Sequence, residues 1–111
     1  MNLEELLQNT KSKKAFLINT NGEVFESFSF QKTIDEIKER RIIAFSSTVT
    51  KMVDHFFREF LTSDLTSIVL KSNNENMVLV KLEDIILCLI SDKNINLGVL
   101  GMTLQKEINK K

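Results

Sequence analysis

Apolar residues recur along the chain with the spacing of helices in some stretches and of strands in others. Between residues 33 and 61 they return every three or four positions, with no glycine or proline, which predicts one long helix. Thr33 and Glu36 have the spacing of a capping box, so the helix is expected to begin at Thr33. At 1.5 Å per residue it would be roughly 43 Å long and would span the whole domain.

The long helix is expected to use two of its sides. Its main apolar stripe should lie on a sheet and consists of Ile42, Phe45, Val49, Val53, Phe56 and Phe60, flanked by Ser46, Met52 and Phe57. A second side carries Ile37, Ala44, Thr48 and Met52. This second side needs another cover, and a second copy of the chain is the economical candidate.

Five shorter stretches read as strands. Residues 15–18 and 85–90 are apolar without interruption, which predicts central strands covered on both faces, the second one continuing to residue 91. Residues 24–30 and 65–71 alternate between apolar and polar, which is typical of positions nearer an edge. Residues 77–82 form the remaining strand.

Turns and terminal helices complete the order of elements. Asn21-Gly22 lies between the first two strands and predicts a hairpin, because both residue types tolerate positive φ. Polar residues at 72–76 and 83–84 predict two further turns. Residues 2–9 form a short helix capped by Asn2, and a final helix is marked by Leu97, Leu100, Leu104 and Ile108.

These elements predict a single α+β domain over residues 1–111, with no linker or internal repeat. Two central strands need helices on both faces, so the long helix should cover one face and the two terminal helices the other. Gly98 and Gly101 weaken the last helix and are expected to allow its close approach to the sheet, although Gly98 could instead only ease the helix start.

Composition narrows the function classes. The 15 Lys and Arg residues balance 15 Asp and Glu residues, and the balance holds in both halves, which argues against a nucleic-acid surface. Cys88 is the only cysteine, so no internal disulfide is possible and a reducing cytoplasm fits. No signal peptide is expected at the N-terminus, and the longest apolar run, residues 85–90, is too short for membrane insertion.

The candidate reactive residues do not combine into a catalytic or metal site. His55 has no Cys or His at a metal-ligand spacing, Cys88 sits inside an apolar strand, and the Glu83-Asp84 pair reads as a solvated turn. The glycines form no phosphate-binding loop. We therefore expect no enzyme activity, no cofactor and no metal. The basic run at residues 11–14 reads as a solvated linker or, less simply, as a contact for acidic headgroups or a partner.

The order of elements, the strand-turn-strand around Asn21-Gly22-Glu23-Val24 and the ending at residues 92–100 together resemble the roadblock family, also called the dynein light-chain roadblock domain. The resemblance covers residues 2–108. It implies a five-stranded antiparallel sheet of order 2-1-5-4-3. It also implies a homodimer or heterodimer in which third strands and long helices pair across a two-fold axis. Family members regulate or scaffold small Ras-like GTPases, or act as light chains and adaptors, and share no catalytic residue.

The resulting hypothesis is a non-catalytic homodimer, or a heterodimer with a roadblock paralogue, that binds a small Ras-like GTPase. The candidate dimer interface consists of Ile37, Ala44, Ser47, Thr48, Met52, Leu65, Ser67, Val69 and Lys71. The candidate partner-binding residues are Arg40, Arg41, Lys51 and Arg58. Two alternatives remain open: a small-molecule sensor, and an adaptor light chain in a motor or membrane-associated complex.

Overall fold

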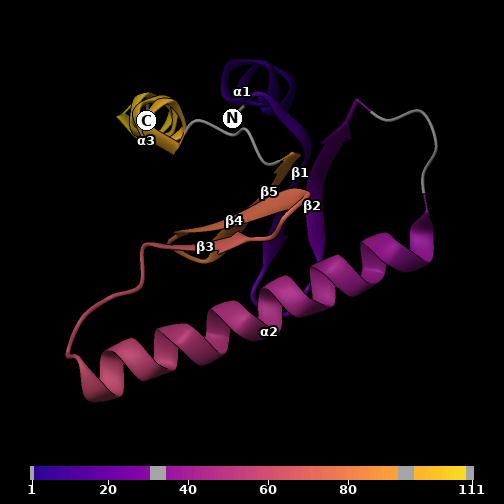
Figure 1. The fold of residues 1–111 in the computed structure, drawn as a ribbon. Coiled ribbons are helices and arrows are strands. Elements are labelled where there is room, and N and C mark those ends of the chain that lie inside the picture. The colour runs from indigo at the N-terminus through magenta and orange to yellow at the C-terminus, as the bar shows by residue number, and fades with distance from the viewer. Residues whose placement is uncertain (1, 31–34, 93–96, 110–111) are drawn as a thin grey trace.

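The computed structural model describes residues 2–30, 35–92 and 97–109, and within them three helices and five strands build one sheet with two covers (Figure 1). The helices are α1 (Leu3–Thr10), α2 (Glu36–Phe60) and α3 (Leu97–Asn109). The strands are β1 (Ser12–Asn19), β2 (Val24–Ser29), β3 (Ser67–Lys71), β4 (Glu75–Leu82) and β5 (Ile85–Asp92).

The sheet is antiparallel with the order β2-β1-β5-β4-β3, as expected. The two strands with uninterrupted apolar residues, β1 and β5, are central neighbours, because only central strands are covered on both faces. The two alternating strands, β2 and β3, form the edges. The strand patterns therefore predicted the lateral positions correctly.

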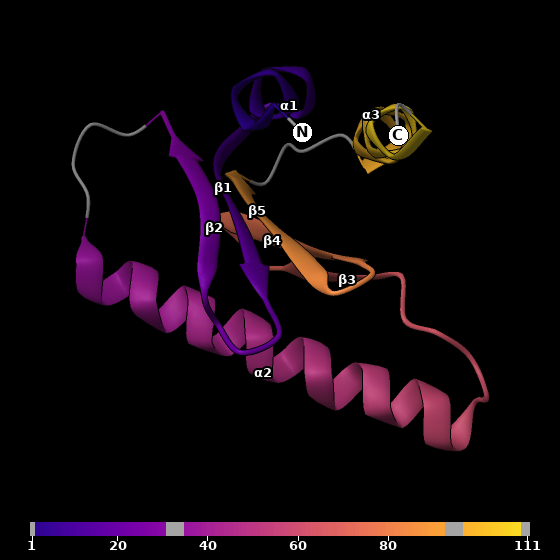
Figure 2. The same cartoon turned by 180° about the vertical axis from the view of Figure 1, so that it is seen from behind.

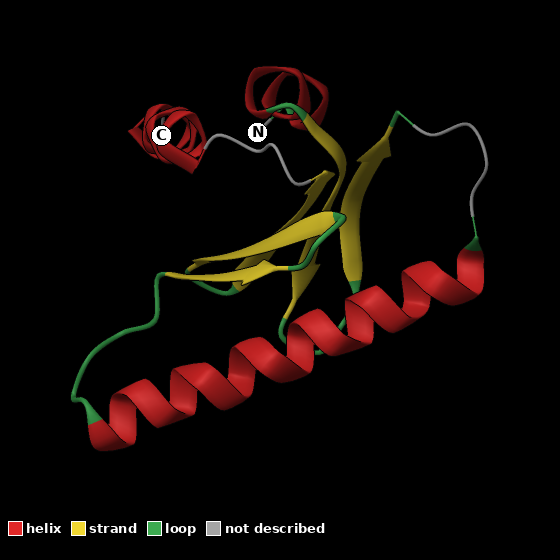
Figure 3. Ribbon diagram, viewed as in Figure 1, coloured by secondary structure: helices red, strands yellow, loops and turns green. Residues whose placement is uncertain are grey.

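Two helical layers enclose the sheet. α1 and α3 lie side by side on one face and α2 crosses the other (Figures 1 and 2). Colouring by secondary structure makes the three layers plain (Figure 3). The core under α1 and α3 consists of Leu3, Leu6, Leu7, Ala15, Val78, Val80, Leu87, Leu89, Leu100 and Leu104. The core under α2 consists of Phe16, Ile18, Leu79, Ile86, Cys88 and Ile90.

Local signals set the first elements. The Asn2 side chain accepts a hydrogen bond from the Glu5 N–H at 3.0 Å, which confirms the predicted cap of α1. The β1–β2 hairpin forms where it was predicted, but of the Asn-Gly pair only Gly22 has positive φ, at 85°. The turn is held instead by the Asn19 side chain, whose oxygen accepts the N–H groups of Asn21 and Glu23 at 2.9 Å each.

The start of α2 differs from the expected capping box. The first helical residue is Glu36, and the Asp35 side chain caps it by accepting the Lys38 N–H at 3.1 Å. Thr33, the expected cap, lies outside the described residues. Asp35 precedes two acidic first-turn residues, Glu36 and Glu39, and all three favour the positive end of the helix dipole.

The side of α2 that faces the sheet is not the stripe expected from the sequence. Ser46, Ser47 and Thr50 are the buried residues of the helix, and Ser46 is 0% exposed. The Ser46 hydroxyl donates to the Ile42 carbonyl at 2.7 Å and lies 3.5 Å from the Cys88 sulfur. A hydroxyl satisfied within its own helix can be buried cheaply, and its small size lets the helix approach the sheet closely.

Only part of the expected stripe touches the core. Ile42 and Val49 pack against the cluster under α2. Phe45, Phe56 and Phe60 are exposed, so the prediction that they lie on the sheet is wrong. The helix is rotated toward its hydroxyl residues, and its two ends extend past the sheet, as the two opposite views agree (Figures 1 and 2).

Two ion pairs fasten α2 across the sheet. The Lys14 ammonium lies 3.3 Å from the Glu39 carboxylate, and the Lys81 ammonium lies 3.7 Å from the Asp54 carboxylate. Lys14 is buried in β1 and Lys81 is half-buried in β4, so these pairs are less screened by solvent than pairs on the surface. The two pairs connect α2 to the sheet near its start and beyond its middle, and so oppose sliding of the helix over the sheet.

Neither glycine of α3 gives the expected close approach to the sheet. Gly98 and Gly101 are both exposed, while Leu100 and Leu104 face the core. A methyl group added at Gly101 would meet nothing within 4 Å, so this glycine allows no close approach within the chain. Among the described helices, none combines the length and the hydropathy that crossing a bilayer requires.

Candidate protein–protein interface

One side of α2, next to the side that faces the sheet, carries a row of apolar side chains, which we call the apolar seam: Phe45, Val49, Met52 and Phe56. Phe45, Met52 and Phe56 are 46%, 67% and 51% exposed, and Val49 is half-buried. Their spacing of three or four residues places them on one side of the helix. Phe60 continues the row, with its ring centroid 5.2 Å from that of Phe56. An exposed row of this kind is typical of a surface that binds another protein.

The edge strand of the sheet next to the seam is β3. Two backbone hydrogen bonds, one just before β3 and one just after it, show which of its residues bond β4. The Lys81 N–H donates to the Thr66 carbonyl at 2.9 Å before the strand. The Ser72 N–H donates to the Glu75 carbonyl at 3.0 Å after it. Thr66 and Ser72 are therefore both residues whose backbone groups point toward β4.

Bonded and non-bonded positions alternate along an antiparallel pair. Between Thr66 and Ser72, the residues that bond β4 are therefore Ile68 and Leu70, opposite Leu79 and Met77. The residues whose N–H and C=O groups point away from β4, toward the open edge, are Ser67, Val69 and Lys71. This edge offers a template for another strand.

A cavity of about 320 Å³ opens where the seam, β3 and the start of β1 come together. Its floor is apolar, with Ile42, Phe45, Leu70, Met77 and Ile90. Four lysines line it as well: Lys13, Lys14, Lys38 and Lys71. Lys13 and Lys14 are paired with Glu75 and Glu39, whereas Lys38 and Lys71 form no ion pair with any described residue.

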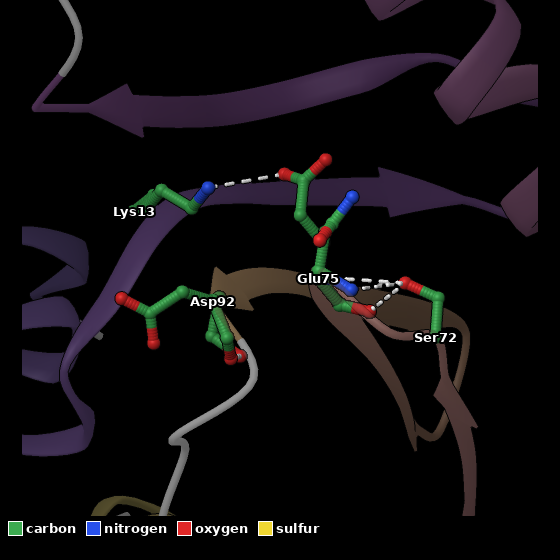
Figure 4. A network of polar contacts seen from close by, with 6 residues as sticks. Lys13, Ser72, Glu75 and Asp92 are labelled. Carbon is green, nitrogen blue, oxygen red and sulfur yellow. Dashed lines mark hydrogen bonds and ion pairs between the residues drawn. The ribbon is translucent and has the colours of Figure 1, made fainter.

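A polar network closes the β3–β4 turn beside this cavity (Figure 4). The Ser72 hydroxyl accepts the Glu75 N–H at 3.0 Å and donates to the Glu75 carbonyl at 2.5 Å. The Lys13 ammonium reaches the Glu75 carboxylate at 3.1 Å and ties the turn to β1. Asp92 ends β5 directly opposite Glu75 in the strand register. These contacts hold the end of β3 in place.

The sequence matches no family model and no curated protein. Solved structures do match. A roadblock/LC7 domain from Streptomyces avermitilis superposes with a TM-score of 0.81 at 14% identity, over 96% of this chain and 88% of that one. MglB of Myxococcus xanthus superposes at 0.79 and 14% identity, over 92% and 81% of the two chains. The gliding protein MglB of Thermus thermophilus gives 0.79 and 16%, over 94% and 78%. This chain has the roadblock fold.

The roadblock fold leaves most of the sequence-predicted dimer residues exposed. On α2 these are Ile37, Ala44, Thr48 and Met52, and on β3 they are Ser67, Val69 and Lys71. Met52 belongs to the apolar seam next to β3, whereas Ile37, Ala44 and Thr48 lie roughly 70–110° around α2 from the seam, at 100° per residue. One partner surface could therefore reach β3 together with Met52.

Ser47 and Leu65 belong to the interior of the chain and not to this surface. Ser47 lies against the sheet side of α2 and its hydroxyl donates to the Ala44 carbonyl at 3.1 Å. Leu65 precedes β3 and is buried. The apolar pattern of the helix instead predicted that Phe45, Phe56 and Phe60 pack against the sheet. Their surface position could have been detected only by noticing that three neighbouring hydroxyl residues form an alternative, less bulky side.

The candidate partner-binding residues fall into two groups. Arg40, Lys51 and Arg58 lie on one side of α2, roughly 140° around the helix from the apolar seam at 100° per residue. All three are exposed, and Arg58 also pairs with Asp54 at 3.4 Å and with Asp64 at 3.6 Å. Arg41 is exposed too, but it lies beside the apolar seam.

The candidate reactive residues of this roadblock fold are dispersed. His55 is exposed on α2, and Glu83 and Asp84 are exposed in the β4–β5 turn. Among residues 2–30, 35–92 and 97–109, no three His, Cys, Asp or Glu side chains come together as a metal site. The basic run continues from exposed Lys11 into β1, where Lys13 and Lys14 form ion pairs, so it is not a solvated linker.

Cys88 is predicted to be inert to alkylation. Burial raises the pKa of its thiol from 9.0 to about 11, opposed by the hydrogen bond from Ser46. Because the pKa rises from 9.0 to about 11, the folded chain has about 100-fold less thiolate at pH 8 than the unfolded chain, and the thiolate is the reactive form. We expect iodoacetamide to label Cys88 at least about 100-fold faster in urea than in buffer. Mass spectrometry measures the labelling rates. Similar rates in urea and in buffer would contradict the buried position of Cys88.

Proposed function

We propose that this chain is a non-catalytic homodimeric interaction module of the cytoplasm that binds a small Ras-like GTPase. The observation that carries the proposal is the unpartnered surface formed by the apolar seam and the open β3 edge. An apolar row and a free strand edge are costly to leave in water, and one second copy could cover both. The resemblance of the sequence to the roadblock family implies the same arrangement. A paralogue of the chain would meet the same requirement.

Self-association is supported by the position of the two features on one side of the molecule. A two-fold axis repeats a surface on both partners, so an edge strand and a neighbouring helix can each meet their own copy. One solved structure with this fold, at 16% identity and a TM-score of 0.80, is described as MglB with a tetrameric arrangement. Light scattering at tens of micromolar should give the mass of a dimer. The mass of a monomer would contradict the proposal.

The basic row of Arg40, Lys51 and Arg58 is the proposed contact for the GTPase. It lies well away from the apolar seam, so dimerisation leaves it accessible, and a dimer presents it twice. Charges at the rim of an interface steer association more than they tighten it. In this proposal the two roles use different sides of α2.

Calorimetry against the Ras-like GTPases of the source organism tests this role. We expect binding that differs between the GDP form and a GTP-analogue form, because a regulator acts only through differential affinity. Lys51→Glu should slow association about 10-fold at low salt. Lys106→Glu on α3 makes the same charge change elsewhere and should have no effect. Equal binding to both forms would leave a scaffold or adaptor role, and no binding to any GTPase would reject this part of the proposal.

The cavity of about 320 Å³ supports the second candidate function, a small-molecule sensor. Its apolar floor and the lysines Lys38 and Lys71, which form no ion pair with a described residue, suit a ligand with an apolar body and an anionic group. Native mass spectrometry of the purified protein should reveal such a ligand as an added mass. A sensor would retain the mass at near-equimolar occupancy, whereas the interaction module should be recovered without it.

A further inference from the structure

The apolar seam continues into charged residues at both ends of α2. Toward the N-terminus the next positions on the same side are Arg41 and Lys38, and toward the C-terminus Glu59 lies beside Phe60 at the end of the row. All three side chains are exposed. Within the described part of the chain, none of the three forms an ion pair. The side thus reads as basic, then apolar, then acidic along the helix.

An antiparallel pair of α2 helices would match this order with itself. A two-fold axis perpendicular to the helix places the N-terminal half of one helix beside the C-terminal half of the other, so basic residues meet acidic ones. A parallel pair would instead place Lys38 beside Lys38 and Glu59 beside Glu59. Like charges in such positions oppose association.

The sheet indicates where along α2 the axis should pass. Lys38, Ile42 and Phe45 line one cavity with Leu70, so the end of β3 lies opposite this part of α2. Asp54 pairs with Lys81, which bonds Thr66, so the start of β3 is level with Asp54. Val69, the middle of the open edge, is one residue from Leu70 and three from Thr66. An axis through Val69 therefore crosses the middle part of α2, between Ile42 and Asp54, and the charged residues select the register within this part.

The geometry points to one register for the two copies, in which the axis passes between Thr48 and Val49; this inference rests on the proposed dimer. Phe45 then lies level with the partner's Met52, Arg41 with the partner's Phe56, and Lys38 with the partner's Glu59. These contacts are an aromatic–sulfur pair, a cation–π pair and an ion pair, each present twice. The charges at the ends of the seam select the register, and the apolar residues between them supply the buried surface.

A neighbouring register is less well matched. If the copies slide so that Phe45 meets the partner's Phe56, Glu59 becomes level with the partner's Ile42. This slide moves the partner's Glu59 four residues along the helix from Lys38, a displacement of about 6 Å at 1.5 Å per residue. The apolar contacts survive this slide but the ion pairs do not. The charged residues are therefore the ones to test.

The test exchanges the charges between two copies. Lys38→Glu and Glu59→Lys should each weaken self-association about 10-fold at low salt, because each turns two attractive pairs into two repulsive ones. The first variant is acidic at both positions and the second is basic at both, so in a mixed dimer both pairs again join opposite charges. Native mass spectrometry of the mixture should therefore show the mixed dimer in at least about 10-fold excess over either homodimer. The preference should shrink in about 1 M salt.

Arg40→Glu is the matched control, since it makes the same charge change two residues from Lys38 but on the other side of α2. It should leave the dissociation constant within about 2-fold of the unmodified chain. Circular dichroism verifies that all variants are folded. If the unmodified chain is a dimer but the mixture shows no preference for the mixed species, the register is wrong and the dimer stands. A monomeric unmodified chain overturns both.

Discussion

Val69→Pro is expected to convert the dimer into a folded monomer. The Val69 N–H points to the open edge of β3, so a proline there removes no bond to β4. In a dimer whose edges pair, it removes one donor per copy and leaves an acceptor unpaired, at a cost of about 1–3 kcal/mol each. Two copies together give at least about 2 kcal/mol, or roughly a 30-fold higher dissociation constant.

Ile68→Pro is the matched control for this prediction. Ile68 is the preceding residue, but its N–H points to β4, and its side chain packs on the core under α2. A proline there breaks the intramolecular ladder and should lower the free energy of unfolding, whether or not a second copy is present. Light scattering over a dilution series, with far-ultraviolet circular dichroism on the same samples, measures both effects. A Val69→Pro variant whose dissociation constant is unchanged would show that β3 does not pair with its copy.

Strand placement could be predicted because it depends on burial on each face, and burial is visible in the pattern of apolar residues. Residues 85–90 are apolar at every position, and β5 indeed lies in the centre of the sheet. The direction of the backbone N–H groups along an edge strand cannot be predicted in this way. Whether the N–H of Val69 or that of Ile68 points to the open edge depends on which residues of β3 and β4 exchange hydrogen bonds. That choice is set by contacts such as the one between Thr66 and Lys81. No local pattern in residues 65–71 carries this information.

The orientation of α2 could not be predicted for a related reason. Pattern analysis counts Ser46, Ser47 and Thr50 as polar and the phenylalanines as core residues. In the fold, the hydroxyl residues face the sheet. Ser46 and Ser47 bond carbonyls of their own helix, so they cost little to bury, and their small size leaves room for a close approach. The exposed phenylalanines of α2, Phe45, Phe56 and Phe60, are the ones that the apolar pattern placed on the sheet. A surface that awaits a partner looks like a core in the sequence, because both are made of the same residues.

Ser46→Leu is expected to destabilise the chain by about 1–3 kcal/mol, because it inserts a larger, branched side chain into a packed contact. Ser46 is fully buried, and its hydroxyl lies against the sulfur of Cys88 in β5. The larger side chain has to push α2 away from the sheet or adopt a strained rotamer. Ser46→Ala, the matched control, removes the hydroxyl without adding volume and should cost less than about 1 kcal/mol.

Phe60→Ala tests the same orientation of α2 from its aromatic side. If the phenylalanine stripe lay on the sheet, this change would cost about 3–5 kcal/mol, as for other buried phenylalanines. Phe60 is 72% exposed, so we expect a change within about 0.5 kcal/mol. Urea unfolding should be measured in the Val69→Pro background, where a second copy does not contribute. A large loss for Phe60→Ala together with a small one for Ser46→Leu would mean that α2 turns its aromatic side to the sheet, and the apolar seam would then not exist as a docking surface.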